Sequence, residues 1–245
     1  SDQVALDAVV NLAGPSIADG RWTEKRKKLV MDVRVNGTRL LAETLAAMEN
    51  KPAVFISGSA IGYYGDTGDA VVDEDSQPGS GFLADIAQQW EAATQPAVAA
   101  GIRTVNIRTG VVLSTEGGML DKLLLPFKMG LGGVVGSGKQ YLSWVSIHEI
   151  VNMIRHLLDN SSISGPVNLV SPEPVTNLVF TRALGAVLNR PTLIPLPSYA
   201  VKLAFGEMGE ELLLSGARVM PKRLVDAGYD FKDENLEQAL ARVLS

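Results

Sequence analysis

Short apolar runs alternate along this chain with longer segments of helical periodicity, and this alternation restricts the fold more than any other feature of the sequence. The runs at residues 7–13, 53–58 and 166–170 are dominated by Val, Ile, Leu and Ala, which is typical of strands buried on both faces. The segments between them repeat apolar residues every three or four positions, as amphipathic helices do. The pattern predicts an α/β protein with a doubly wound parallel sheet, covered by helices on both faces.

The order of the expected elements divides the chain into a larger and a smaller part. Strand-like runs at 103–108 and 141–145 complete the strands, and helical segments fall at 23–33, 35–48, 83–99, 120–129, 148–158 and 177–188. From about Pro197 the helical segments continue to the C-terminus without a clear strand. We therefore expect one domain over residues 1–196 and a small, mostly helical lobe over residues 197–245.

The composition argues against several classes of function. The chain has 245 residues, a formal net charge of −5 at pH 7, no cysteine and two histidines. The acidic balance argues against a nucleic-acid-binding surface, and the lack of cysteine excludes disulfides and thiolate catalysis. His148 and His156 have no carboxylate-rich surrounding, so we expect no metal. No apolar run is long enough to span a membrane and none resembles a signal peptide, which favours a cytoplasmic protein.

Two glycine-rich patterns match the glycine spacing of phosphate-binding loops but not the elements that flank such loops. Gly130, Gly133 and Gly136 have the spacing G-x-x-G-x-x-G, and residues 133–139 read GVVGSGK. Such loops need a strand before them and a helix after them, and Ser or Thr must follow the lysine to hold magnesium. Here the preceding segment looks helical, the following one looks extended, and Gln140 follows the lysine. We interpret the stretch as a glycine-rich crossing loop.

The stretch SGSAIGYYG, residues 57–65, lies at the end of the strand predicted for residues 53–58. In doubly wound sheets, ligands bind beyond the carboxyl ends of the strands. Two serines and two adjacent tyrosines therefore stand where an active site is expected.

Six motifs occur in a fixed order: DAVVNLAG (7–14), RVNGTRLL (34–41), SGSAIGYYG (57–65), RTGVVL (108–113), GSGKQYLSWVSIHEIV (136–151) and PKRLVDAGYDF (221–231). Together they resemble the landmarks of extended short-chain dehydrogenase/reductases, and more closely those of the branch called epimerase-family proteins. The resemblance implies a Rossmann-like domain over residues 1–196, with substrate-side elements at about 130–196. It also implies two βα units before residue 7, with the glycine-rich dinucleotide loop, that this sequence does not contain and that would lengthen the native protein by about fifty residues.

The resemblance further implies a dinucleotide at the carboxyl edge of the sheet, NADP(H) rather than NAD(H). The residues at 12–14 and Arg34 would contact the nucleotide, and residues 57–59 and 109–112 would surround the nicotinamide. Each residue alone also suits a turn, a surface ion pair or the core, but their order together favours a nucleotide site. The expected cofactor-binding residues are Leu12, Ala13, Gly14, Arg34, Ser57, Gly58, Thr109, Gly110, Val111 and Val112.

The catalytic pattern of the resembled family is incomplete in this chain. Short-chain reductases use a Tyr as general acid/base, with a Lys four residues later that lowers the Tyr pKa from about 10. None of the five tyrosines has a lysine four positions on, and the family's positions for the pair fall near Phe82 and Ile86. Ser59, at the position of the catalytic hydroxyl, and the pair Tyr63 and Tyr64 are the remaining candidate catalytic residues, with Tyr64 preferred as donor.

Three functions stay open at this point. The first, which we prefer, is an NADP(H)-dependent oxidoreductase or epimerase for a small carbonyl or sugar-nucleotide substrate. The second is an NADP(H)-binding sensor or regulator with little catalysis, linked to cell division as some relatives are. The third is a structural or partner-binding protein without a cofactor. In the preferred case the partner is a small molecule, without nucleic acid or membrane, and the protein is a monomer or homodimer.

Overall fold

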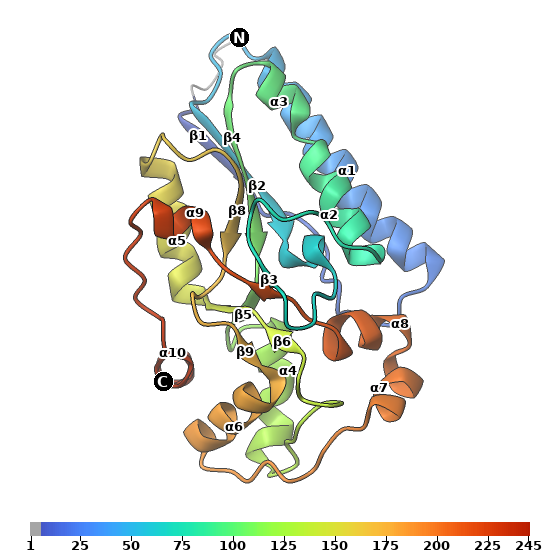
Figure 1. The fold of residues 1–245 in the computed structure, drawn as a ribbon. Helices are drawn as coiled ribbons and strands as arrows, with labels where there is room; N and C mark the ends of the chain where they lie inside the picture. The colour runs from blue at the N-terminus through green and yellow to red at the C-terminus, as the bar shows by residue number, and fades with distance from the viewer. Residues whose placement is uncertain (1–5) are drawn as a thin grey trace.

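A parallel four-stranded sheet forms the centre of the molecule. The computed structural model describes residues 6–245 (Figure 1). The sheet has the order β1 (Ala8–Asn11), β2 (Val54–Ala60), β4 (Arg103–Thr109) and β8 (Gly165–Leu169), and every neighbouring pair is parallel. The register pairs Val10 with Ile56 and Ser59 with Arg108. The parallel α/β fold predicted from the alternating pattern is confirmed.

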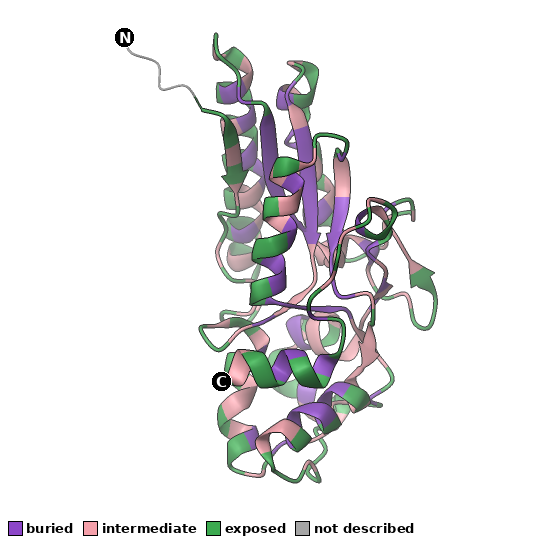
Figure 2. Ribbon diagram, turned by 90° about the vertical axis from the view of Figure 1, so that its left-hand side faces the viewer, coloured by how far each residue is buried: buried purple, intermediate pink, exposed green. Residues whose placement is uncertain are grey.

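Helices cover both faces of this sheet (Figure 1). On one face lie α1 (Glu24–Ala47), α2 (Phe82–Ala92) and α3 (Gln95–Ala99), and on the other lie α5 (Ile147–Asp159) and α9 (Lys222–Asp226). Phe55 packs with Ala42, Leu45 and Ala97 on the first face, whereas Ile56 and Ile107 pack with Met153 and Leu157 on the second. The central strands are buried by these two layers (Figure 2), which explains their continuous apolar runs.

The helical segments differ from the sequence-based expectation at two positions. Residues 23–48, expected as two helices, form the single 24-residue helix α1, which begins at the N-cap Thr23 and buries Val30, Val35, Thr38, Ala42 and Leu45 on one side. This buried stripe continues through the expected break, and no proline interrupts it. Conversely, residues 83–99, expected as one helix, form α2 and α3, because the chain turns after Ala92 and Pro96 lies in the first turn of the second helix.

A second group of elements lies beyond the carboxyl ends of the sheet (Figure 1). It consists of β5 (Val111–Leu113) paired with β7 (Trp144–Ser146), α4 (Gly118–Lys128), and α6 (Asn177–Leu188), with β6 (Tyr141–Leu142) antiparallel to β9 (Val175–Thr176). Trp144, Phe127 and Phe180 form its own buried cluster together with Leu240 near the C-terminus. These elements close one side of the site described below.

The C-terminal region is mostly helical, as expected, but it contains one strand. Its elements are α7 (Ser198–Phe205), α8 (Glu207–Gly209), a π-helical turn (Glu210–Leu214), β10 (Arg218–Val219), α9 and α10 (Leu236–Leu244). The strand β10 pairs in parallel with β3 (Val71–Val72), which lies between β2 and α2 along the chain. Two residues are too short to produce a period-two pattern, so the sequence could not reveal either strand.

A buried carboxylate fastens this region to the second face of the sheet. Glu149, at the start of α5, is 1% exposed and accepts hydrogen bonds from the Tyr229 hydroxyl and from the backbone N–H groups of Lys232 and Asp233. Asp233 in turn accepts from the Ser146 hydroxyl and pairs with Arg242. Residues 229–242 therefore pack on the same body as the sheet. No helix within residues 6–245 has the length and apolar content needed to cross a membrane.

Candidate active site

The strands β1, β2 and β4 end at one edge of the sheet, and the residues expected to bind a cofactor gather there. The residues that follow β1, Leu12, Ala13 and Gly14, are exposed. In contrast, Ser57, Gly58 and Ser59 are buried in the C-terminal half of β2. Residues 109–112, which end β4 and begin β5 with Gly110 between the two strands, are half-buried. Gly110 fits tightly, since a Cβ there would lie 2.5 Å from the Ser143 carbonyl oxygen.

Ser59 is held by a carboxylate that the sequence did not reveal. Its hydroxyl donates to Glu91 Oε1 at 2.7 Å, and Arg108 donates to both oxygens of the same carboxylate, at 2.8 and 3.0 Å. Arg108 is 3% exposed and the Glu91 side chain 14%. Because a buried arginine and carboxylate stabilise each other only when their hydrogen bonds are satisfied, this bidentate pair fixes Glu91 and, through it, the direction of the Ser59 hydroxyl.

The two tyrosines meet the same arginine. The Tyr64 hydroxyl donates to Asn168 Oδ1 at 2.7 Å and accepts from Arg108 at 2.9 Å, and the Arg108 guanidinium lies over the Tyr63 ring, 3.5 Å from its centroid. Burial raises the pKa of Tyr64 to about 12, and the neighbouring Arg108 offsets only part of that effect. Tyr64 is 3% exposed and Tyr63 is half-buried. The Tyr64 hydroxyl thus has both of its partners inside the protein.

Glu91, Arg108 and Asn168 belong to this site although none of them was expected there from the sequence. A usable signal existed for Arg108, which stands beside Val105 and Ile107 in a strand that is buried on both faces. A charged side chain inside a parallel sheet requires a buried partner of opposite charge. That reasoning predicts a carboxylate near Arg108, but it does not select Glu91 among the 27 acidic residues.

The helix positions where the family carries its Tyr and Lys are filled by apolar side chains. Phe82, the first residue of α2, packs edge-on against Trp22, with Lys27 over its ring, and Ile86 is buried. Glu211, from the C-terminal region, accepts hydrogen bonds from the backbone N–H groups of Phe82 and Leu83. The start of α2 therefore carries neither a tyrosine nor a lysine at the two family positions.

Arg34 covers the exposed turn that follows β1. It donates to the Pro15 carbonyl at 2.8 Å, and a Cβ on Gly14 would lie 3.1 Å from its guanidinium carbon, so a larger residue at Gly14 would displace it. Behind this turn Thr38 accepts hydrogen bonds from Asn11 and from the Trp90 indole. The Trp90 ring passes so close to Gly58 that a Cβ there would lie 2.7 Å from it.

A cavity of about 60 Å³ lies on the other side of the edge, between α4, α6 and the π-helical turn. None of its lining residues carries a charge. Its polar groups include the Gln140 amide, which donates to the carbonyls of Val135 and Leu213, and Asn177, which accepts from the Val135 N–H. Among residues 6–245, no group of three or more His, Asp or Glu side chains is arranged to hold a metal ion. The lining residues are Met119, Leu123, Phe127, Gly133, Val135, Gln140, Tyr141, Leu142, Asn177, Phe180, Thr181, Leu212, Leu213 and Ser215.

A parallel sheet with helices on both faces and a serine near the carboxyl end of its second strand gives a Rossmann-like fold, which is the fold of the extended short-chain dehydrogenase/reductases. Comparison with known families agrees with this class. The family described as "NAD dependent epimerase/dehydratase family" matches residues 1–169, and a domain of unknown function, DUF1731, matches residues 196–243. The chain belongs to the NAD dependent epimerase/dehydratase family.

Individual relatives support the same placement. Epimerase family protein Mb2239 of Mycobacterium bovis is 46% identical over 235 residues, which are 96% of this chain and 77% of that protein. The crystal structure of human epimerase family protein SDR39U1 (isoform2) with NADPH is 36% identical, with a TM-score of 0.92, and covers 97% of this chain and 81% of that one. A nucleoside-diphosphate sugar epimerase from Corynebacterium glutamicum is 34% identical, with a TM-score of 0.78, over 97% of this chain and 46% of that one.

Proposed function

We propose that this protein is an NADP(H)-dependent oxidoreductase or epimerase that acts on a small carbonyl or sugar-nucleotide substrate without a Tyr-x-x-x-Lys pair. Family membership and the NADPH in the similar human protein support the cofactor. The name of the Corynebacterium relative supports a sugar nucleotide as one substrate class. Assembly as a monomer or homodimer and a cytoplasmic location remain predictions.

The observation that carries this proposal is the contact between Ser59 and Glu91. The Ser59 hydroxyl donates its one hydrogen bond to Glu91. The lone pairs of Ser59 Oγ are therefore free to accept a proton from a substrate hydroxyl. We propose that Ser59 takes this proton while its own passes to Glu91, and that the reverse occurs during reduction. The cofactor supplies or accepts the hydride. Arg108 holds the carboxylate in place with two hydrogen bonds.

The residues at the carboxyl edge fit a dinucleotide. In the exposed turn that follows β1, the small residues Ala13 and Gly14 allow a ligand to approach the backbone closely. We propose that Leu12, Ala13, Gly14 and Arg34 hold the nucleotide, and that the following residues lie around the nicotinamide: Ser57, Gly58, Thr109, Gly110, Val111 and Val112.

The tyrosine pair has a supporting part in the proposal. A phenol with a raised pKa stays neutral at physiological pH, so we propose that Tyr64 orients Arg108 and Asn168 rather than acting as a base. Tyr63 is the more exposed of the two, and we propose that it borders the substrate.

The test uses the full-length protein with Ser59→Ala and Tyr199→Phe, the latter changing an exposed tyrosine as a control. We expect saturable NADPH binding by calorimetry in the wild type and in both variants. We expect turnover, measured as NADPH oxidation with carbonyl compounds or as epimerisation of sugar nucleotides, to fall about 100-fold or more in Ser59→Ala only. Absence of NADPH binding would refute the cofactor, and unchanged turnover in Ser59→Ala would refute the role of Ser59.

A second candidate function is supported by the start of α2. Phe82 and Ile86 replace the acid and the cation of the usual mechanism, which suits a protein that binds NADP(H) as a sensor with little catalysis. In that case NADPH binds but is not oxidised with any substrate of the panel. Clear turnover would remove this candidate.

A further inference from the structure

Two arginines on one side of α1 point at the turn that follows β1. Arg26 and Arg34 are separated by eight residues, about two helical turns, and the buried Val30 lies between them on the same face. Arg26 donates to the carbonyl of Ser16 at 2.6 Å, and Arg34 donates to the carbonyl of Pro15 at 2.8 Å. Because these carbonyls belong to adjacent residues, the two guanidinium groups are held close together.

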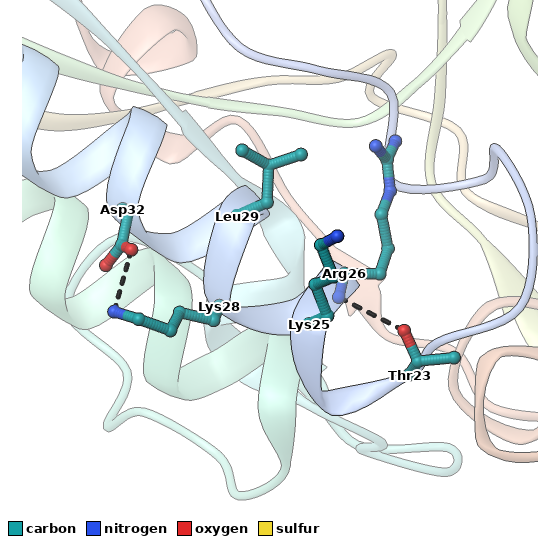
Figure 3. Close-up of a pocket in the computed structure, with 6 residues that line it drawn as sticks. All are labelled: Thr23, Lys25, Arg26, Lys28, Leu29 and Asp32. Carbon is teal, nitrogen blue, oxygen red and sulfur yellow. Dashed lines mark hydrogen bonds and ion pairs between the residues drawn. The ribbon is translucent and has the colours of Figure 1, made fainter.

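Neither arginine has a carboxylate partner among residues 6–245. The acidic side chains of the surroundings pair elsewhere: Asp32 with Lys28 at 2.8 Å, Asp19 with Lys122 at 3.4 Å, and Glu207 with Lys27. Figure 3 shows the Arg26 side chain extending away from the Lys28–Asp32 pair, in a surface hollow that Lys25 also lines. Positive charge is thus left uncompensated on this part of the molecule.

The partial burial of two neighbouring positive charges is energetically unfavourable. Both arginines are half-buried, and Arg26 Nε is buried without a hydrogen-bond partner in the described structure. Burial lowers the pKa of Arg34, and repulsion from Arg26 lowers it further. Two like charges with unused N–H donors in a partly desolvated setting favour the binding of an anion.

The two guanidinium groups also lie beside the ligand edge of the sheet. The carbonyls that they bind follow directly on Gly14, where the lack of a Cβ leaves room for the Arg34 guanidinium. A planar guanidinium binds phosphoryl oxygens in pairs, and two such groups suit a diphosphate better than a single carboxylate.

We propose that Arg26 and Arg34 form a phosphoryl-binding site at the end of β1. The ligand is a phosphate or diphosphate group, carried either by the dinucleotide or by a phosphorylated second substrate. The inference deepens the proposed function, since it adds Arg26 and names the charged group that the edge recognises, but the presence of the site does not depend on catalysis by Ser59.

The competing explanation is that both arginines only fasten the turn at residues 14–16. Calorimetry with inorganic pyrophosphate separates the two explanations in the full-length protein. We expect Arg26→Gln and Arg34→Gln each to weaken pyrophosphate binding about tenfold or more, because a charge-assisted hydrogen bond is lost. Arg39→Gln removes an exposed arginine from the same helix and should leave binding within twofold. Equal pyrophosphate affinity in all three variants and the wild type would overturn the proposal.

Binding of NADPH identifies the source of the phosphoryl group. If it belongs to the dinucleotide, NADPH and pyrophosphate compete, and both arginine variants bind NADPH about tenfold more weakly. If it belongs to the second substrate, pyrophosphate binds to the NADPH-saturated protein and the NADPH affinity is unchanged. Either result supports the site, and each is separate from the Ser59→Ala result that tests the catalytic proposal.

Arginine modification gives a second measurement that needs no variant, in case the loss of either guanidinium unfolds the turn. Phenylglyoxal modifies accessible arginines, and peptide mass spectrometry reports the extent at each one. We expect pyrophosphate to slow modification of Arg26 and Arg34 at least fivefold without changing that of Arg39. Equal modification rates with and without pyrophosphate at Arg26 and Arg34 contradict the proposal.

Discussion

At the residue scale, a single buried arginine organises the candidate active site. Arg108 reaches Glu91 with two hydrogen bonds, Tyr64 with one and the Tyr63 ring with its flat face. Each contact fixes one neighbour, and Glu91 in turn fixes Ser59. A substitution of Arg108 or Glu91 therefore alters both the stability of the fold and the direction of the Ser59 hydroxyl.

Removal of the Glu91 carboxylate should lower the stability of the fold. Glu91→Ala leaves Arg108 as a buried charge without an anion, so we expect the free energy of unfolding to fall by about 3–5 kcal/mol. Urea denaturation followed by circular dichroism measures this change. Glu43→Ala, which removes an exposed carboxylate from α1, serves as control and should change stability by less than about 0.5 kcal/mol. A similar small effect for Glu91→Ala would show that the pair with Arg108 is unimportant for stability.

Tyr64 should make stability depend on pH in the alkaline range. Its pKa is raised from 10.0 to about 12, so the folded state retains the phenol proton when the unfolded state has lost it. The contribution is fully present below pH 10 and is lost between pH 10 and 12, by about 2–3 kcal/mol in all. Urea denaturation of wild type and Tyr64→Phe from pH 8 to 12 should give curves whose difference changes only in that window. A constant difference would contradict the raised pKa.

At the scale of single elements, α2 depends on a residue far away in the sequence. Its N-cap is Gly81, which has no side chain to accept the first N–H groups of the helix. Glu211 supplies this acceptor with both carboxylate oxygens, and its negative charge also suits the helix N-terminus. The helix that contributes Glu91 is therefore capped by the C-terminal region.

Loss of that cap should loosen the start of α2. We expect Glu211→Ala to lower the free energy of unfolding by about 1–2 kcal/mol and to speed hydrogen exchange at the amides of Phe82 and Leu83. Glu210→Ala removes the neighbouring exposed carboxylate, whose ion pair with Lys202 lies at the surface, and should have a small effect. Unchanged exchange at Phe82 and Leu83 in Glu211→Ala would show that the helix start is fixed by other contacts.

At the scale of the whole molecule, the C-terminal region packs on both the sheet and the elements beyond it. Leu224 lies in the core of the sheet's second face, Leu240 packs with Trp144, and β10 pairs with β3. Glu149 connects the loop at 229–233 to α5. We propose that residues 1–196 and 197–245, although divided by the order of their expected strands and helices, fold as one cooperative unit.

One cooperative unit should unfold in one step. We expect coincident urea transitions by tryptophan fluorescence and circular dichroism, and a loss of about 3 kcal/mol or more in Glu149→Ala, since two backbone N–H groups lose their buried acceptor. His148→Ala, at the adjacent exposed position, is the control. Two separate transitions, with only one shifted by Glu149→Ala, would instead indicate two independent domains.

The sequence by itself determined the class of fold, the approximate position of most helices and strands, and the family, because hydrophobic periodicity and ordered motifs are local properties of the chain. It also determined that a Tyr-Lys pair is absent. Only the tertiary structure decided which carboxylate meets Ser59 and Arg108, which residue caps α2, and that β3 pairs with β10. Ser59 and Glu91 are separated by 32 residues, and Phe82 and Glu211 by 129. Contacts between residues so far apart in the sequence depend on how the elements pack together, and a local sequence pattern does not reveal them.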